Sequence, residues 1–405
     1  MTNQTPAEIL SLLLMPDGPG RADPYPLYAA LHEQGPAVDA DGIVMVPGYD
    51  AASAVLRDPA FKVHDASSYD VVMPDWREHP SMIMDSLLSL NEPAHARIRR
   101  LLTKGFTARR VAGLEPAIAA MADRLLDDLA ERGHGGRPVE FMHDFAFLLP
   151  VTVICELIGI PEADRERFRP LARDLVATLE PVGAEQLAAA DAATAELRQY
   201  FAVLARERRA DPRDDLMSAL VGINDSGDGR LTDDELLDNL TLLLVAGFET
   251  TVNLLGNGLR IVLADPIFGE DVLDGVVTAG EFVEEVLRYD SPVQLTSRHR
   301  PDESEVAGLA VAPDTEVIVM LGAANRDPAR FNEPNRFNPA RSGPGPLSFG
   351  GGLHFCLGAA LARLEAAVAF PRILSRFPRI AAAGDPVRRN GLVLRGFDTL
   401  PVVLD

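Results

Sequence analysis

The residues best suited to chemistry are those around Cys356, in the stretch Phe-Gly-Gly-Gly-Leu-His-Phe-Cys-Leu-Gly at positions 349–358. Glycines lack a Cβ and tolerate positive φ, so the backbone on both sides of the cysteine can turn tightly against a flat group. Residues 357–365 are predicted to be helical, which places the sulfur at a helix N-terminus, where the dipole favours an anion and lowers a thiol pKa. The pattern predicts a lone thiolate that binds a metal, with backbone N–H groups tuning its charge.

The pattern F-x-x-G-x-H-x-C-x-G resembles the haem-binding loop of the cytochrome P-450 family. The resemblance implies that Cys356 is the axial ligand of the iron in haem b (iron protoporphyrin IX). It also implies that Phe349, His354 and Gly358 contribute to binding this cofactor. Two other interpretations remain open. In the first, Cys356 is a catalytic nucleophile paired with His354, although the two members of such pairs usually come from distant parts of the sequence. In the second, Cys356 is an inert buried thiol.

A second motif lies in residues 233–263, which predict a single helix roughly 45 Å long, at about 1.5 Å per residue. Residues 240–248 are almost wholly apolar, so the middle of this helix must be buried on most sides. The sequence Ala-Gly-Phe-Glu-Thr-Thr at 246–251 overlaps that run, and polar groups buried there need partners. Thr250 can donate to the carbonyl of Ala246 and so open the helix locally.

This segment resembles the family's A-G-x-[D/E]-T-T oxygen-binding motif. The resemblance implies that Thr250 donates a hydrogen bond to dioxygen, the co-substrate, and that Glu249 passes protons from solvent. It further implies that the small residues Ala246 and Gly247 leave room for dioxygen. If the resemblance is set aside, the same residues are also consistent with a threonine-capped kink in a core helix.

Glu285 and Arg288 lie three residues apart on a predicted helix at 281–289 and match the family's E-x-x-R. An i,i+3 ion pair is usually a surface pair worth about 0.2–0.5 kcal/mol. In the family the two residues join an arginine from the loop before the cysteine, and Arg336 matches that arginine here. The resemblance implies a structural role for these three residues, in which they brace the haem loop.

Haem carries two propionates, which need cations or hydrogen-bond donors. His95 and Arg99 match the family's H-x-x-x-R, and Arg298 and His354 match its other propionate partners. Alternatively, His95 and Arg99 belong to a solvated basic face.

The segment 93–114 is a basic island with six Lys or Arg and no acid, in a chain whose net charge is −22. The resemblance places this helix on the cysteine side of the haem, where an electron donor docks. The island is therefore either a docking surface for an acidic ferredoxin, which opposite charge would steer to it, or an ordinary solvated helix.

Residues 224–235 have the spacing of a calcium-binding EF-hand loop, with Gly at the sixth place and Glu at the twelfth. However, Asn224 and Ser226 replace the first two acidic ligands, and the helix that follows is too long for an EF-hand. Thr232 and Glu235 also form a capping box for that helix. We therefore predict a helix cap in preference to a calcium site.

The composition is that of a soluble protein with a large core: 47% of the 405 residues are hydrophobic and 24% are charged. Two cysteines, Cys155 and Cys356, exclude a disulfide framework and fit a reducing compartment. Cys155 lies in an apolar run and is expected to pack in the core. The apolar run 9–15 is too short to cross a bilayer, and no basic segment precedes it.

The net charge of −22 argues against nucleic acid and against a strongly anionic membrane surface as partners. From the short apolar run without a basic leader we expect a cytoplasmic protein with no membrane anchor, and we also expect a monomer.

The predicted fold is mainly α with small β-sheets. Helical patterns dominate residues 93–209 and 233–263, whereas 37–46 predicts a hairpin and 316–321 a short strand. No internal repeat or domain boundary is visible, so we expect one domain over residues 1–405. The resemblance implies the cytochrome P-450 fold, with haem between a long central helix and the loop that carries the cysteine.

The resemblance extends over nearly the whole chain and implies a monooxygenase. Such an enzyme inserts one atom of dioxygen into a C–H bond of a small hydrophobic molecule and reduces the other atom to water. Only 49 residues follow Cys356, too few for a flavin or nicotinamide domain, so a separate ferredoxin and ferredoxin reductase are expected as electron donors. Two alternatives remain, a peroxide-driven peroxygenase and a haem-binding sensor without turnover. The acid–alcohol pair Glu249–Thr250 argues against the peroxygenase.

The resemblance also predicts the walls of a substrate pocket, which are mostly apolar segments: 63–90, 168–186, 242–246, 292–296 and 392–397. The candidate pocket side chains, each of which otherwise belongs to an ordinary core, are Met82, Ile83, Leu242, Val293, Leu295 and Val393. A pocket of this kind suits a mid-sized hydrophobic molecule, such as an intermediate of natural-product biosynthesis.

Overall fold

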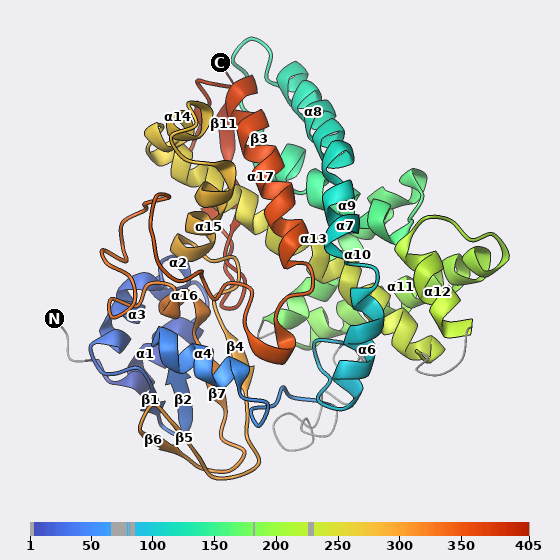
Figure 1. The fold of residues 1–405 in the computed structure, drawn as a ribbon. Coiled ribbons are helices and arrows are strands. Elements are labelled where there is room, and N and C mark those ends of the chain that lie inside the picture. Colours follow the sequence, from blue (N-terminus) through green and yellow to red (C-terminus); the bar gives the residue numbers. More distant parts are fainter. Residues whose placement is uncertain are drawn as a thin grey trace.

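The computed structural model describes residues 4–65, 79, 81, 86–180, 183–225 and 231–404. Helices dominate, and most of the short strands gather with α1, α3 and α4 on one side of the molecule (Figure 1). The remainder of the molecule is mainly helical and includes the long helices α8, α11, α13 and α17. The prediction of a mainly α fold with small sheets is confirmed.

The α-helices of the first half are α1 (Pro6–Leu14), α2 (Pro19–Ala22), α3 (Tyr25–His32), α4 (Tyr49–Arg57), α6 (Ala94–Thr103), α7 (Ala108–Gly113), α8 (Glu115–Arg132), α9 (Leu148–Ile158) and α10 (Phe168–Val176). Those of the second half are α11 (Ala184–Ala210), α12 (Leu216–Asp225), α13 (Asp233–Ala264), α14 (Ile267–Leu273), α15 (Ala279–Tyr289), α16 (Leu321–Ala324) and α17 (Ala359–Arg376). Single turns of other helical types are η2 (Met142–Ala146), η3 (Glu162–Arg167), η4 (Ala177–Leu179) and η5 (Gly352–His354).

The largest sheet has four strands in the order β1-β2-β7-β4. Its first hairpin joins β1 (Val38–Ala40) to β2 (Ile43–Val46) through Asp41 and Gly42, which have φ of 55° and 91°. Two successive positive φ angles suit the twist of a two-residue hairpin turn, so the Asp-Gly pair accounts for this hairpin. The other two strands are β7 (Val317–Val319), which runs parallel to β2, and β4 (Thr296–Arg298).

The remaining strands form small sheets: β3 (Val139–Glu140), β11 (Pro401–Val403) and β8 (Ala381–Ala382) in one, β5 (Ser304–Val306) and β6 (Leu309–Val311) in another, and β9 (Val387–Arg388) with β10 (Phe397–Thr399) in the third. The loop of the β9–β10 hairpin contacts the central helix α13.

Helix α13 is the core helix that the sequence predicted, continuous from Asp233 to Ala264. Its N-terminus has the expected capping box: Glu235 N donates to Thr232 Oγ1 at 3.1 Å, and Thr232 N donates to Glu235 Oε2 at 2.8 Å. Positions 226–230 of the EF-hand-like stretch lie outside the described residues, and within the described part no metal-binding cluster of acids, histidines and cysteines exists.

Neighbouring helices approach α13 closely at its glycines. A Cβ on Gly247 would lie 2.8 Å from Ile154 of α9, and one on Gly258 would lie 2.2 Å from the Phe370 ring of α17. Of the helices that the structure describes, α13 is the one apolar and long enough for a membrane span, and 72% of its most apolar window is buried inside the protein.

Candidate active site

The loop that carries Cys356 is closed by a hydrogen bond from Cys356 N to Phe349 O at 3.0 Å. Within it, Gly350 and Gly352 have φ of 69° and 61°, a region that side chains with a Cβ rarely adopt. A Cβ on Gly352 would also lie 2.2 Å from Leu56 O, because the loop packs against the C-terminal end of α4. The glycines are therefore required for this turn.

The Cys356 thiol is exposed, unlike the buried Cys155, so the interpretation as an inert core thiol is wrong. Its pKa is nevertheless raised by burial, because protein surrounds the accessible sulfur. Hydrogen bonds from the N–H groups of Gly358 and Ala359, just before and at the start of α17, act in the opposite direction and lower the pKa. The net shift is therefore upward for the protein alone, contrary to the expectation from the helix position, and a cation in contact with the sulfur would favour the thiolate.

Four basic side chains converge beside this loop, and among the described residues Glu92, at 3.5 Å from His95 Nδ1, is the one carboxylate with an ion-pair contact to them. Burial, followed by the charges of Arg298, His95 and Arg99, lowers the pKa of His354 to about 3. Burial also lowers the pKa of Arg298 to about 10, and its guanidinium donates only to Thr296 and Ser297 oxygens.

The rings of His95 and His354 are 4.3 Å apart, which places α6 directly beside the cysteine loop. His95 is 1% exposed and neither ring nitrogen makes a hydrogen bond, although Nδ1 lies 3.5 Å from Glu92 Oε1. Buried donors without acceptors are costly, so this cluster indicates that acceptors belonging to a ligand complete it.

These features fit a haem. Its two propionates are the anions that the cluster of His95, Arg99, Arg298 and His354 lacks, and its iron is the cation that the Cys356 sulfur lacks. The tight glycine turns let the loop backbone approach a flat ring. The structure thus brings together five of the residues predicted for cofactor binding: His95, Arg99, Arg298, His354 and Cys356.

Helix α13 has a stripe of accessible residues in its otherwise buried middle. Leu242, Ala246 and Thr250 are each four positions apart and are partly or fully exposed, whereas Leu244 and Phe248 are completely buried. Thr250 Oγ1 lies 3.4 Å from Ala246 O, a long hydrogen bond that leaves the hydroxyl available to another partner. The stripe is the face that a ligand would contact. Gly247, by contrast, is explained by packing on Ile154, and its role beside dioxygen stays a prediction.

Glu249 is 7% exposed and forms an ion pair with Arg389, which follows β9. Sequence reasoning missed this arginine, because the two residues are 140 positions apart and no local pattern links them. The ion pair connects the central helix to the C-terminal hairpin.

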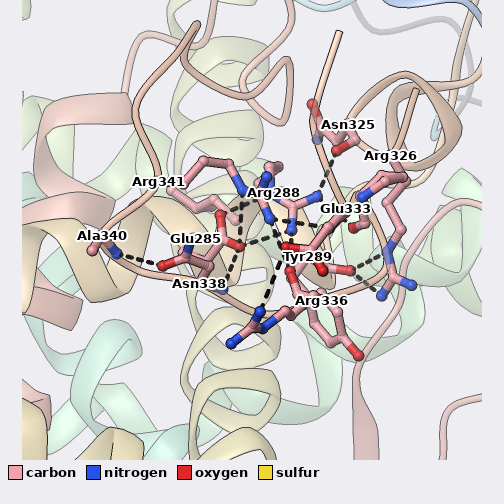
Figure 2. Close-up of polar contacts among 12 residues, drawn as sticks. Glu285, Arg288, Tyr289, Asn325, Arg326, Glu333, Arg336, Asn338, Ala340 and Arg341 are labelled. Atoms are coloured by element: carbon pink, nitrogen blue, oxygen red, sulfur yellow. Dashed lines mark hydrogen bonds and ion pairs between the residues drawn. The ribbon is translucent and has the colours of Figure 1, made fainter. Parts of the chain in front are cut away.

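The Glu285–Arg288 pair of α15 is buried, at 4% and 2% exposure, and is not the surface pair that its spacing usually gives. Arg288 Nε and Nη2 each donate to one Glu285 carboxylate oxygen at 2.7 Å. The remaining N–H groups of Arg288 donate to the carbonyls of Asn325, Pro334 and Arg336 at 3.0, 2.8 and 3.1 Å. Figure 2 shows this network, which binds α15 to the segment before the cysteine loop.

The prediction that the Arg336 side chain joins this pair is wrong. Arg336 is 71% exposed and contacts Glu333 at 3.5 Å, because the turn in which Arg336 N donates to Glu333 O directs its side chain outward. Arg336 takes part only through its carbonyl. The guanidinium beside Glu285 belongs to Arg341, whose Nε lies 3.4 Å from Glu285 Oε1 and whose side chain is 11% exposed (Figure 2).

Two of the predicted pocket segments lie next to each other. Gln294 N donates to Val393 O at 2.8 Å, and Val293 and Leu394 form an isolated β-bridge. Val293, Leu295 and Val393 are all partly exposed, like Leu242 on α13. Met82 and Ile83 lie outside the described residues.

The comparisons with known proteins agree with this geometry. The model of the family described as cytochrome P-450 matches residues 40–272 and 278–390. The chain belongs to the cytochrome P-450 family. The family in general uses haem and dioxygen, so haem is the expected cofactor of this chain.

Curated relatives span nearly the full chain. This chain is 36% identical to the 6-deoxyerythronolide B hydroxylase of Saccharopolyspora erythraea, and the match covers 95% of this chain and 96% of the relative. It is 37% identical to the monooxygenase PikC of Streptomyces venezuelae over 94% and 91%. The protein is therefore a cytochrome P-450 monooxygenase.

Solved structures show the same fold. CYP164A2 of Mycobacterium smegmatis has a TM-score of 0.87 at 36% identity, covering 98% of this chain and 99% of that one. P450BioI, solved with a fatty-acyl-carrying acyl carrier protein, has a TM-score of 0.86 at 32% identity, covering 95% and 99%.

Proposed function

We propose that this P-450 hydroxylates a C–H bond of a mid-sized hydrophobic natural-product intermediate, with haem b as its cofactor and a separate ferredoxin as its electron donor. The observation that carries the haem site is the cluster of four basic side chains, His95, Arg99, Arg298 and His354, beside an accessible cysteine. Of these, Arg99, Arg298 and His354 have no ion pair with a described carboxylate. No other group of described residues combines unpaired buried donors with a glycine-rich thiol loop.

Each residue around the cofactor has a distinct task. His95, Arg99, Arg298 and His354 would bind the propionates, and Cys356 would ligate the iron, with the N–H groups of Gly358 and Ala359 stabilising the negative sulfur. When bound, the haem supplies the activation of dioxygen, with electrons received one at a time from the donor.

Glu249 and Thr250 handle protons on the distal side. The Thr250 hydroxyl is on the accessible stripe and is held only by a long hydrogen bond, so it is free to orient a proton toward a ligand. Glu249 is the neighbouring carboxylate, and a carboxylate can exchange protons with water at neutral pH. We therefore assign proton delivery to this pair, which also favours a dioxygen-dependent monooxygenase over a peroxygenase.

The substrate class is inferred from apolar pocket residues and from two relatives. Leu242, Val293, Leu295 and Val393 offer hydrocarbon contacts and no charge. One relative is named for a macrolide precursor, 6-deoxyerythronolide B, and P450BioI was solved with a fatty-acyl chain on a carrier protein. Both names are consistent with a hydrophobic molecule of intermediate size.

The electron donor would dock over α6 and α7. Arg99 of α6 lies close enough to Cys356 for the two charges to interact. Arg97 and Arg110 pair with Glu235 and Asp214. This leaves Arg100, Lys104 and Arg109 exposed and without a described ion pair. In a chain with net charge −22, three free cations next to the cysteine loop favour an acidic partner.

Turnover tests the proposal. Purified holoenzyme is mixed with an acidic ferredoxin, its reductase and NAD(P)H, and a library of macrolide precursors and fatty acids is screened for the spin-state shift and then for hydroxylated product. Dioxygen-dependent product with loss of turnover at high salt would support it. Product formed only with added hydrogen peroxide would favour the peroxygenase, and a nitrogen-type carbon monoxide spectrum would exclude Cys356 as the ligand.

A further inference from the structure

The loop between β9 and β10 contacts two carboxylates that lie far apart in sequence. Its base is closed by Arg389 N donating to Gly396 O at 3.2 Å. At this base the Arg389 guanidinium binds Glu249 of α13. A Cβ on Gly396 would lie 2.0 Å from Asn253 Oδ1, one helical turn beyond Glu249, so the loop rests directly on the central helix.

The tip of the same loop holds the carboxylate of Glu180. Leu392 N donates to Oε2 at 2.7 Å, Leu394 N donates to Oε1 at 2.9 Å, and Val393 N lies 3.1 Å from both oxygens. A Cβ on Gly391 would lie 2.7 Å from Glu180 Oε1, so glycine makes the approach possible. Three successive N–H groups turned toward one anion form a nest, which is a strong anion-binding arrangement.

Glu180 comes from the segment that follows α10 and η4, and it is 17% exposed. Arg21 is its one ion-pair partner in the described structure, at 3.6 Å, so the nest provides most of its contacts. The charges of Asp398 and Glu180 both act on Arg389, which places all three groups within one electrostatic environment.

We propose that Arg389 is a positioning residue for the Glu249 carboxylate, and that Glu180 controls this position by pinning the loop to the α10 side of the pocket. The pocket residue Val393 belongs to the stretch that Glu180 holds, four positions after Arg389. A substrate that displaces this stretch would therefore also move Arg389, and with it the acid that handles protons. The inference rests on the proposed proton role of Glu249.

The test uses the holoenzyme with ferredoxin, reductase and NAD(P)H, and measures the solvent deuterium isotope effect on NAD(P)H oxidation. We expect Arg389→Gln to change the isotope effect at least twofold, with Arg389→Lys close to the wild type because it keeps the cation. Glu180→Gln should change it in the same direction, since the neutral amide binds the nest less tightly. The thiolate-type carbon monoxide spectrum should stay unchanged in all three variants.

Glu162→Gln is the matched control, because Glu162 is an exposed acid in the first turn of η3, outside the predicted pocket segments. It should match the wild type. As a second readout, Glu180→Gln should bind the probe 4-phenylimidazole severalfold faster, because the pocket wall is no longer pinned.

The Glu249→Gln variant distinguishes a failure of the positioning role of Arg389 from a failure of the proton role of Glu249. If it changes the isotope effect and Arg389→Gln does not, the positioning role is wrong and the proposed function stands. If neither variant changes it, the proton role of Glu249 fails. An altered isotope effect in Arg389→Gln with a wild-type value in Glu180→Gln would overturn the control by Glu180.

Discussion

Replacing Arg341 and Arg336 separately by glutamine tests which arginine supports the buried pair of α15. Arg341 reaches Glu285 at 3.4 Å and also donates to the carbonyls of Glu333 and Arg336 at 3.2 and 3.0 Å. Arg336 contacts only Glu333 through its side chain, and both members of that pair are more than 60% exposed. We expect Arg341→Gln to destabilise the protein and Arg336→Gln to leave it nearly unchanged.

The magnitude follows from how much of each contact is buried. Glu285 keeps Arg288 and the Asn338 N–H when Arg341 is lost, so the cost is below the roughly 3–5 kcal/mol of a fully broken buried pair. One partly buried charged hydrogen bond gives about 2 kcal/mol for Arg341→Gln. The exposed Arg336 pair gives about 0–1 kcal/mol. For 405 residues at about 2.1 cal/mol/K each, 2 kcal/mol lowers Tm by about 2 °C.

The assay is thermal unfolding of the holoenzymes by circular dichroism, together with the fraction that retains the thiolate-type carbon monoxide spectrum on heating. Arg341→Lys, which keeps the charge but not the planar fork, should fall between the wild type and Arg341→Gln. A larger loss of Tm in Arg336→Gln than in Arg341→Gln would refute this interpretation of the network.

Three further predictions concern other positions. Glu365 is 1% exposed, and burial raises its pKa well above the usual value. Between about pH 4.5 and the folded pKa, the unfolded state ionises at this residue and the folded state does not. The free energy of unfolding of the wild type therefore falls by about 1.4 kcal/mol per pH unit over that range. The Tm advantage of Glu365→Gln should therefore grow as the pH rises above about 4.5, and a difference that stays constant with pH would contradict this. Gly258→Ala forces a methyl group to 2.2 Å from Phe370, so it should cost about 1–3 kcal/mol in denaturant unfolding, and Phe370→Leu in the same chain should recover part of the loss. Thr250→Ala should keep the carbon monoxide spectrum and raise the hydrogen peroxide formed per NAD(P)H, whereas unchanged coupling would remove Thr250 from the proton path.

Much of the fold was predictable because its signals are local. The Asp-Gly turn specifies the β1–β2 hairpin, and Thr232 with Glu235 specifies where α13 begins. The apolar run inside α13 identified it as the core helix. Turn chemistry and capping depend on residues within four positions of each other, so they are visible in the sequence.

The parts that were missed depend on distant contacts. Arg341 and Arg336 are equally plausible partners in the sequence, and only the turn at Glu333 decides which one faces inward. Nothing local links Arg389 to Glu249. The raised pKa of the Cys356 thiol also depends on how much protein surrounds it, which helix position alone does not determine.

The way in which Arg288 holds the chain before the cysteine loop has a consequence for mutational tolerance. The Arg288 guanidinium donates hydrogen bonds to the main-chain carbonyl oxygens of Asn325, Pro334 and Arg336. Because every amino acid supplies that oxygen, most substitutions at Pro334 and Arg336 should preserve the anchor as long as the backbone keeps its path. This stretch is therefore a permissive site for labels or engineered surface charge, whereas replacing Arg288 would remove its hydrogen bonds to all three carbonyls at once.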